Sequence, residues 1–240
     1  MKKRENIFIY LFPAIAGIFF LGCLFSSCGK TNTVLPQASN TVYQVVNLSP
    51  DLLPIDLYIS LQKKNASPFT YPNPSGYFSL TSVDTPFQIR SSSVTVSTTN
   101  IFSIDTLLKN NLHYTLFISG FRATNTLKYI LTTDSASVPK GGRGKIRFIN
   151  VSPNSPNLDV AANGTAAFTS QAYMKPSKYI EFPVGNYTFT VNPTGQPTTL
   201  LQTSLPTVTV QDGKIYTLYS RGVVGRTDSA GFALSVIKNN

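Results

Sequence analysis

Alternating apolar and polar residues are the dominant pattern of the chain from residue 41 onward. The alternation is clearest in four short runs, residues 145–149, 187–191, 208–210 and 215–219. Successive side chains of a β-strand point to opposite faces, so a period of two predicts strands with one buried face. The runs are rich in Thr, Val, Ile, Tyr and Phe, which suit such a surface, and no long run with helical period occurs. The pattern therefore predicts an all-β chain.

The chain also contains an internal duplication. The sequence Asn150-Val-Ser-Pro153, followed by Asp159, repeats the earlier Asn47-Leu-Ser-Pro50, followed by Asp56, with the same spacing. Further matches place residues 74–80 opposite residues 176–182, and residues 114–117 opposite residues 216–219. The offset is 103 residues at the motif and 102 at the later anchors, so one gap of a single residue aligns them all. This agreement indicates two homologous units of about a hundred residues, which is a common domain size.

Turn and linker residues divide the chain. Residues 41–134 and 145–240 are the predicted repeats, joined by a polar linker over residues 135–144 that leaves them free to move or to pack end to end. Asn110-Asn111 and Asp212-Gly213 lie between predicted strands and are interpreted as hairpin turns. Many short strands with frequent turns predict two tandem antiparallel β-sandwiches, of immunoglobulin-like or transthyretin-like topology.

Residues 1–28 are predicted to be a lipoprotein signal peptide. Basic residues precede an apolar run over residues 7–25, and Leu24-Phe-Ser-Ser-Cys28 resembles a lipobox, in which the cysteine receives lipid. Cys28 is therefore the predicted lipidation site, with Cys23 as a weaker candidate and an uncleaved membrane anchor as the alternative. Residues 29–40 would form a tether. Either interpretation places the repeats outside the cytoplasmic membrane. We expect a protein of the bacterial cell envelope, lipid-anchored in the outer membrane, with its periplasmic or surface orientation left open.

Several of these motifs resemble a known family. The pattern of apolar run, Ser-Pro and Asp, then Pro183-Val-Gly-Asn-Tyr-Thr-Phe189, then Gly-Lys-x-Tyr-Thr over residues 213–217, resembles the DUF4397 family over residues 41–238. The resemblance implies an exported or lipid-anchored bacterial β-domain, often in tandem copies, without an established biochemical role.

Candidate catalytic and metal-binding groups are sparse. Both cysteines lie within residues 1–28, which excludes thiol chemistry from the repeats, and His113 is the single histidine. No Gly-x-Ser-x-Gly motif is present. Asp51 and Asp56 with Asn47 suggest a calcium site, but the second copy keeps only Asp159 as a carboxylate. We therefore predict no enzyme activity, no cofactor and no metal site.

The charge balance adds one candidate surface. The formal net charge is +10, and Lys140, Arg143, Lys145 and Arg147 form the main basic cluster. Such a cluster attracts anions, but a solvated linker is the simpler interpretation. Nucleic acid is not an expected partner, because the chain is predicted to be exported and contains no nucleic-acid-binding motif.

The repeated motif is interpreted as structural. Ser49-Pro50 and Ser152-Pro153 are predicted to begin turns, and Asp56 and Asp159 to accept hydrogen bonds from amides of those bends. We expect a non-enzymatic, lipid-anchored module for adhesion or protein interaction. The alternative is a glycan-binding module that uses exposed aromatic rings, and a third hypothesis is a hydrolase with an unrecognised carboxylate pair.

Overall fold

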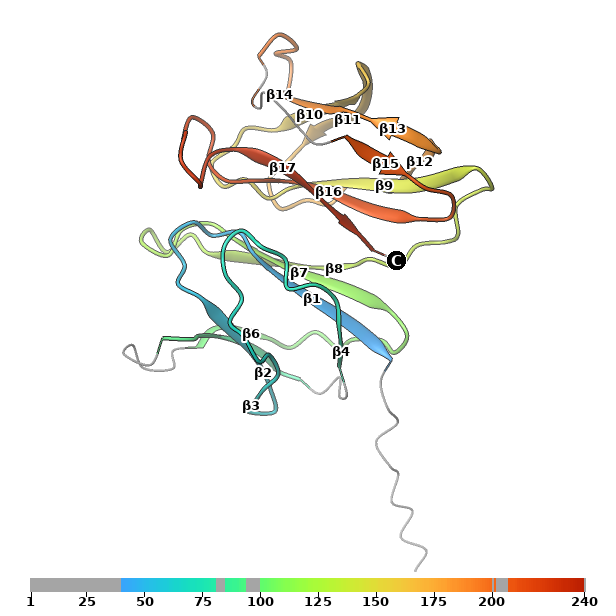
Figure 1. The fold of residues 1–240 in the computed structure, drawn as a ribbon. Helices are drawn as coiled ribbons and strands as arrows, with labels where there is room; N and C mark the ends of the chain where they lie inside the picture. Colours follow the sequence, from blue (N-terminus) through green and yellow to red (C-terminus); the bar gives the residue numbers. More distant parts are fainter. Residues whose placement is uncertain (1–39, 81–84, 94–99, 200, 202–206, 240) are drawn as a thin grey trace, which may run out of the picture. The chain divides into compact units, whose positions relative to one another are not determined.

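The computed structural model describes residues 40–80, 85–93, 100–199, 201 and 207–239. The predicted signal peptide, its Cys28 and residues 29–39 of the predicted tether lie outside the described residues. All regular elements in the described part of the chain are β-strands, which confirms the all-β prediction (Figure 1). Within that part, no helix reaches the length and apolarity that a membrane span requires.

Repeat 1 is a sandwich of two four-stranded sheets. Their strand orders are β4-β1-β7-β8 and β3-β2-β5-β6. The bounds of these strands are β1 Thr41–Asn47, β2 Ile55–Ile59, β3 Gln62–Lys63, β4 Phe78–Leu80, β5 Phe87–Ser91, β6 Asn100–Ile104, β7 His113–Ser119 and β8 Lys128–Thr133.

Repeat 2 has the same arrangement. Its first sheet has the order β12-β9-β16-β17, and its second is divided into β11-β10-β14 and the pair β13-β15, because the strand over residues 185–193 is interrupted at Thr188. The bounds are β9 Arg143–Asn150, β10 Leu158–Ala162, β11 Thr165–Gln171, β12 Ile180–Pro183, β13 Gly185–Tyr187, β14 Phe189–Pro193, β15 Val208–Val210, β16 Ile215–Arg221 and β17 Ala233–Lys238.

The strand order distinguishes the two predicted topologies. An immunoglobulin fold places its first, second, fourth and fifth strands in one sheet. Here the first strand instead lies beside β4 and β7 in repeat 1 and beside β12 and β16 in repeat 2, which is the transthyretin-like arrangement. The strand pairs β1–β7 and β9–β16 run parallel, and all other neighbouring strands are antiparallel. The prediction of tandem β-sandwiches is confirmed.

The two predicted hairpin turns are present as turns, but the prediction that they form hairpins is wrong. The turn at Asn110-Asn111 joins β6 to β7, and the turn at Asp212-Gly213 joins β15 to β16, so each links strands of different sheets. Only the second residue of each turn has positive φ, 62° at Asn111 and 70° at Gly213. These turns therefore carry the chain across the sandwich.

Each sandwich has its own core, and a third apolar cluster lies outside both. Tyr43 stacks on Phe87 in the first core with ring centroids 5.8 Å apart, and Phe148 lies against Phe168 in the second at 6.0 Å. Burial of each such side chain contributes roughly 1.5–3 kcal/mol. The third cluster joins the repeats, which belong to one compact unit, and we call it the inter-repeat cluster: Val46, Leu48, Phe117, Ile149, Val151, Tyr219 and Ile237.

Candidate functional site

The inter-repeat cluster is built from matching positions of the two repeats. All of its members are 6% exposed or less. Phe117 on β7 meets Tyr219, its counterpart on β16, with ring centroids 5.4 Å apart. The other matched pairs are Val46 with Ile149, and Leu48 with Val151. Because each repeat contributes the same face, the contact resembles that between two subunits of a symmetric dimer, within a single chain.

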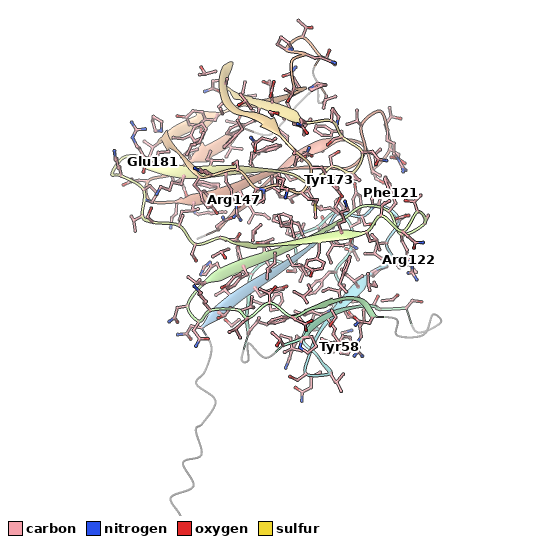
Figure 2. All side chains as sticks on the ribbon, turned by 180° about the vertical axis from the view of Figure 1, so that it is seen from behind. Tyr58, Phe121, Arg122, Arg147, Tyr173 and Glu181 are labelled. Atoms are coloured by element: carbon pink, nitrogen blue, oxygen red, sulfur yellow. The ribbon has the colours of Figure 1, made fainter. Side chains whose placement is uncertain are left out.

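A buried ion pair lies beside this cluster. Arg147 on β9, labelled in Figure 2, is 5% exposed at its side chain. It forms a salt bridge with Asp134, which is 0% exposed at its side chain and follows β8. The guanidinium also donates to Thr217 Oγ1 at 3.0 Å, to Thr133 O at 2.9 Å and to Thr132 Oγ1 at 3.0 Å. One side chain of repeat 2 therefore bonds the end of repeat 1 at three residues.

Asp134 is surrounded by further donors. Its Oδ2 accepts from Tyr77 OH at 2.6 Å and from Thr115 Oγ1 at 2.5 Å. Burial, together with the charge of Asp134, raises the pKa of Tyr77 far above its usual value, so this phenol stays protonated and donates. Arg147 lies over the ring of Tyr179, 5.0 Å from its centroid. The pair is thus hydrogen-bonded on both partners, as buried charges require.

The duplication gives Arg147 a neutral counterpart in repeat 1. In the two parallel strand pairs, Gln44 lies opposite Thr115 just as Arg147 lies opposite Thr217. Gln44 is 2% exposed, so its position on β1 is as buried as that of the arginine on β9. The basic member of the ion pair therefore corresponds to an amide.

Asp134 likewise has a neutral counterpart, Asn239, which follows β17. The backbone nitrogen of each residue donates to the first residue of the neighbouring strand, Asp134 to His113 O at 2.7 Å and Asn239 to Ile215 O at 2.8 Å. The side-chain Nδ2 of Asn239 donates to Tyr179 OH and to Thr217 Oγ1, both at 2.9 Å. These groups are the counterparts of the tyrosine and the threonine that donate to Asp134.

One buried polar atom on each of the two neutral counterparts lacks a hydrogen-bond partner. Gln44 Nε2 and Asn239 Oδ1 have no hydrogen-bond partner among the described residues, and each residue is 2% exposed. One atom is a donor and the other an acceptor, and they belong to the positions that correspond to Arg147 and Asp134. The interface thus carries a charged pair at one place and, at the symmetric positions, two neutral residues with one unsatisfied polar atom each.

The predicted basic cluster is partly wrong. Arg147 is not solvated, for the reasons given above, and Lys145 donates to Ser137 O at 2.9 Å and lies 3.9 Å from Glu181. Of the four residues, Lys140 alone is exposed in a loop, whereas Arg143 is partly exposed and begins β9. The alternation over residues 145–149 places Arg147 with Lys145 on the polar face, so no local signal indicates its burial.

The repeated Asn-x-Ser-Pro motif forms the turn that leaves the interface. In both copies the asparagine Oδ1 accepts from the serine backbone nitrogen, at 3.2 Å for Asn47 and 3.3 Å for Asn150. All four of these asparagines and serines are 0% exposed. Ser119 Oγ of repeat 1 also donates to Val151 O at 2.7 Å, within the second motif. The interpretation of the motif as structural is therefore supported by its contacts, which include one between the repeats.

The two motif aspartates do not have the hydrogen-bond partners that the sequence predicts. Asp56 is buried and accepts from the side chains of Asn65 at 2.8 Å and Lys63 at 2.9 Å. Asp159 accepts from Ser170 N at 2.7 Å and Gly195 N at 3.2 Å, which lie in β11 and after β14. Neither therefore serves the Ser-Pro bend, because both side chains point from the second strand toward its own sheet neighbours.

Replacing Asp159 by asparagine is expected to lower the free energy of unfolding by about 1 kcal/mol, since its site is partly exposed. The hydrogen bond from Ser170 N, opposed by burial and helped by Thr194 and Gly195, lowers the pKa of Asp159. A lowered folded-state pKa stabilises the fold above the unfolded-state value of about 3.9 and loses that contribution as pH falls. Urea unfolding at pH 7 and pH 3 should therefore show a difference between wild type and Asp159→Asn that shrinks at the lower pH. An unchanged difference would contradict this role.

Most other carboxylates of the described residues have structural partners as well. Asp51 accepts from Arg122 N at 2.9 Å and Ala123 N at 3.0 Å, and Asp212 from Gly142 N at 2.8 Å. Glu181 lies near Lys145, and Asp228 pairs with Arg226. Across the described ranges, no three His, Cys, Asp or Glu side chains come together as metal ligands would.

Each sandwich has a shallow hollow at its side. The hollow of repeat 1, about 360 Å³, includes Lys64, Asn73 and Phe78 in its wall. The hollow of repeat 2, about 320 Å³, includes Ala167 and Phe182. Neither wall contains a histidine or a pair of carboxylates. The hollows can hold a small ligand by shape, but they offer no arrangement for acid–base chemistry.

Comparisons with known proteins point to one family. The family described as "Domain of unknown function (DUF4397)" matches residues 43–161 and 144–240. No curated protein sequence matches the chain. Among solved structures, the Bacillus anthracis TIE protein is similar at 10% sequence identity and a TM-score of 0.20, over 84% of this chain and 44% of its own. The chain thus spans less than half the length of that protein, and at this TM-score the likeness carries no argument about fold or function.

Proposed function

The chain belongs to the DUF4397 family, a domain of unknown function, and we propose that it is a non-enzymatic binding module of the bacterial cell envelope. Its two sandwiches act as one rigid body that presents loops to a protein partner. The observation that carries this proposal is the interface between the repeats. A buried ion pair and an apolar cluster fix two domains in one geometry, and such a fixed geometry serves binding by limiting the entropy lost on association.

The arrangement of polar groups supports a binding role over catalysis. The carboxylates described above are held by backbone amides or by basic side chains, as with Asp51 and Asp134. A catalytic pair would instead need two carboxylates facing a cleft with one proton-donating and one ionised member. The single histidine, His113, contacts Asn239 O through Nδ1 at 2.8 Å, within the interface.

A protein partner is favoured over a glycan by the distribution of aromatic rings. Stacking on sugars needs rings that offer a free face. Among the aromatic residues of the described ranges, only Tyr129 is exposed by more than a third, at 39%, and its ring lies 5.0 Å from that of Phe102. Exposed aliphatic side chains occur on several loops, among them Leu61 at 73% and Val184 at 50%.

Crosslinking in the native envelope tests this function. A photo-reactive amino acid would be placed singly at Leu61, Asn154 and Val184, which lie in different exposed loops. We expect crosslinks to one discrete protein from some of these sites and none from the others. Binding of the purified chain to a glycan array, without a protein crosslink from any site, would replace this proposal by the glycan alternative.

The lipid anchor is part of the proposal and has its own test. Replacing Cys28 by serine should release the protein from the membrane fraction or leave the unprocessed precursor, because the thiol is the acceptor of the lipid. The matched variant Cys23→Ser should remain in the membrane fraction with mature mass. Intact mass and fractionation measure both. A lipid-modified Cys28→Ser variant would show that the site is elsewhere.

A further inference from the structure

One end of the compact unit collects the starts of four strands and a set of basic side chains. β1, β7, β9 and β16 all begin there, and we call this the basic end; the opposite end, with the Ser-Pro turns, is the motif end. Hydrogen bonds join the strand starts: Val42 N donates to Leu112 O at 3.1 Å, His113 Nδ1 contacts Asn239 O at 2.8 Å, and Asn239 N donates to Ile215 O at 2.8 Å.

Two interlocked loops bring the cations together at this end. The loop over residues 139–144 meets the turn over residues 211–214, where Gly213 N donates to Arg143 O at 2.9 Å and Lys145 N to Lys214 O at 2.8 Å. Lys238, at the end of β17, donates from Nζ to Gln211 Oε1 at 2.8 Å. Lys140 projects from the first loop and is exposed.

The carboxylates nearest to these cations are already engaged. Asp212 accepts from Gly142 N at 2.8 Å and from Arg143 N at 3.2 Å. Glu181 lies 3.9 Å from Lys145 Nζ and accepts from Lys140 N at 3.3 Å. Lys140, Arg143, Lys214 and Lys238 therefore form a basic surface in which no side chain is paired with a carboxylate by a salt bridge.

We propose that this basic surface rests on an anionic lipid bilayer. The proposal deepens the proposed function, since it assumes that the protein is anchored through Cys28. The predicted tether leads along the chain into β1, which begins at Thr41 and hence at the basic end. Twelve residues separate Cys28 from Thr41, a covalent reach of at most about 40 Å. The anchor therefore attaches at the basic end, and the motif end lies one strand length further from it.

The physical chemistry of membrane binding favours this pairing of signals. A lipid chain and a basic surface together give firmer attachment than either alone. Each lysine or arginine close to an anionic surface strengthens binding roughly fivefold. The attraction falls off over a Debye length, which is about 8 Å at physiological ionic strength, and it weakens as salt is added. The motif end then faces away, at a distance of roughly 20 Å given by the seven-residue strand β1. In Figure 2, Glu181 marks the basic end and Arg122 the motif end.

Hydrogen exchange of the full, lipid-modified chain in vesicles tests the proposal. The vesicles would contain phosphatidylcholine alone or with about a third of phosphatidylglycerol, an anionic fraction chosen to give a strong surface potential. We expect exchange of the amides in residues 140–144 and 211–214 to slow at least about fivefold in anionic vesicles, the contribution of one basic residue. High salt should remove this protection.

Two variants decide between the ends. The variant with Lys140, Arg143, Lys214 and Lys238 replaced by glutamine should lose the protection. A control with Arg122, Lys128 and Lys175 replaced by glutamine removes cations of the motif end and should keep it. Equal protection in wild type and the first variant, or equal loss in both variants, would overturn the proposal.

The proposed lipid anchor and the proposed binding of the basic surface can be contradicted independently. Recovery of the protein without lipid would contradict the anchor. That lipid-free chain would then be mixed with the same vesicles. Co-sedimentation with the anionic but not the neutral vesicles, lost in the first variant alone, supports the basic surface. Equal co-sedimentation of both variants contradicts it.

Discussion

Replacing Arg147 by glutamine, or Asp134 by asparagine, is expected to lower the free energy of unfolding by about 3–5 kcal/mol. Each single change leaves the partner's charge in a site that is 5% exposed or less. The double variant should recover most of this loss, because glutamine and asparagine are the residues that the symmetric positions, Gln44 and Asn239, already carry. Urea unfolding of the four proteins gives the coupling energy between the two residues directly.

An exposed ion pair of the same chain supplies the control for this cycle. Arg226 and Asp228 form a salt bridge with side chains that are 46% and 54% exposed. Replacing Arg226 by glutamine should therefore cost less than about 1 kcal/mol. Additive losses at Arg147 and Asp134, with no recovery in the double variant, would show that the buried pair does not couple the repeats.

Truncating Phe117 to alanine is expected to cost about 3–5 kcal/mol, as for other fully buried aromatic residues. Its ring is 0% exposed and meets Tyr219 of the other repeat. The cavity lies between the sandwiches, so we expect both repeats to lose hydrogen-exchange protection, although the change lies in repeat 1. Calorimetry gives the loss of stability, and exchange resolved by peptide shows where it occurs.

The partly buried Phe102 is a suitable control for the same measurement, because it contacts Tyr129 within repeat 1 at 5.0 Å between ring centroids. Phe102→Ala should be milder and should leave the protection of repeat 2 unchanged. Should Phe117→Ala loosen repeat 1 alone, the inter-repeat cluster would not transmit stability between the two sandwiches.

Local patterns were sufficient to predict the strands and the duplication. A period of two is a property of each strand by itself, and β15 coincides with the predicted run over residues 208–210. The ends of strands were less accurate, since β9 begins at Arg143 rather than Lys145. The turn residues at Asp212-Gly213 indicated a reversal of the chain correctly, but not that the next strand lies in the other sheet.

Long-range contacts were beyond such patterns. The sequence of residues 140–147 does not distinguish the buried Arg147 from the exposed Lys140. The difference arises because residues of repeat 1, which is distant in sequence, cover Arg147 on β9. Alignment of the repeats gives one indication that Arg147 is buried. It matches Gln44, which lies within the apolar run over residues 42–46. The partners of Asp56 and Asp159 lie on strand neighbours that sequence spacing does not identify.

A distance measurement between the repeats tests the central claim, that the two sandwiches form one rigid body. Spin labels carried by unnatural amino acids at Ser103 on β6 and Thr169 on β11, both exposed, would report their separation by pulsed electron resonance. The interface described here predicts a single narrow distance distribution that broadens when Asp134 is replaced by asparagine. A broad distribution in the wild-type protein would contradict the claim.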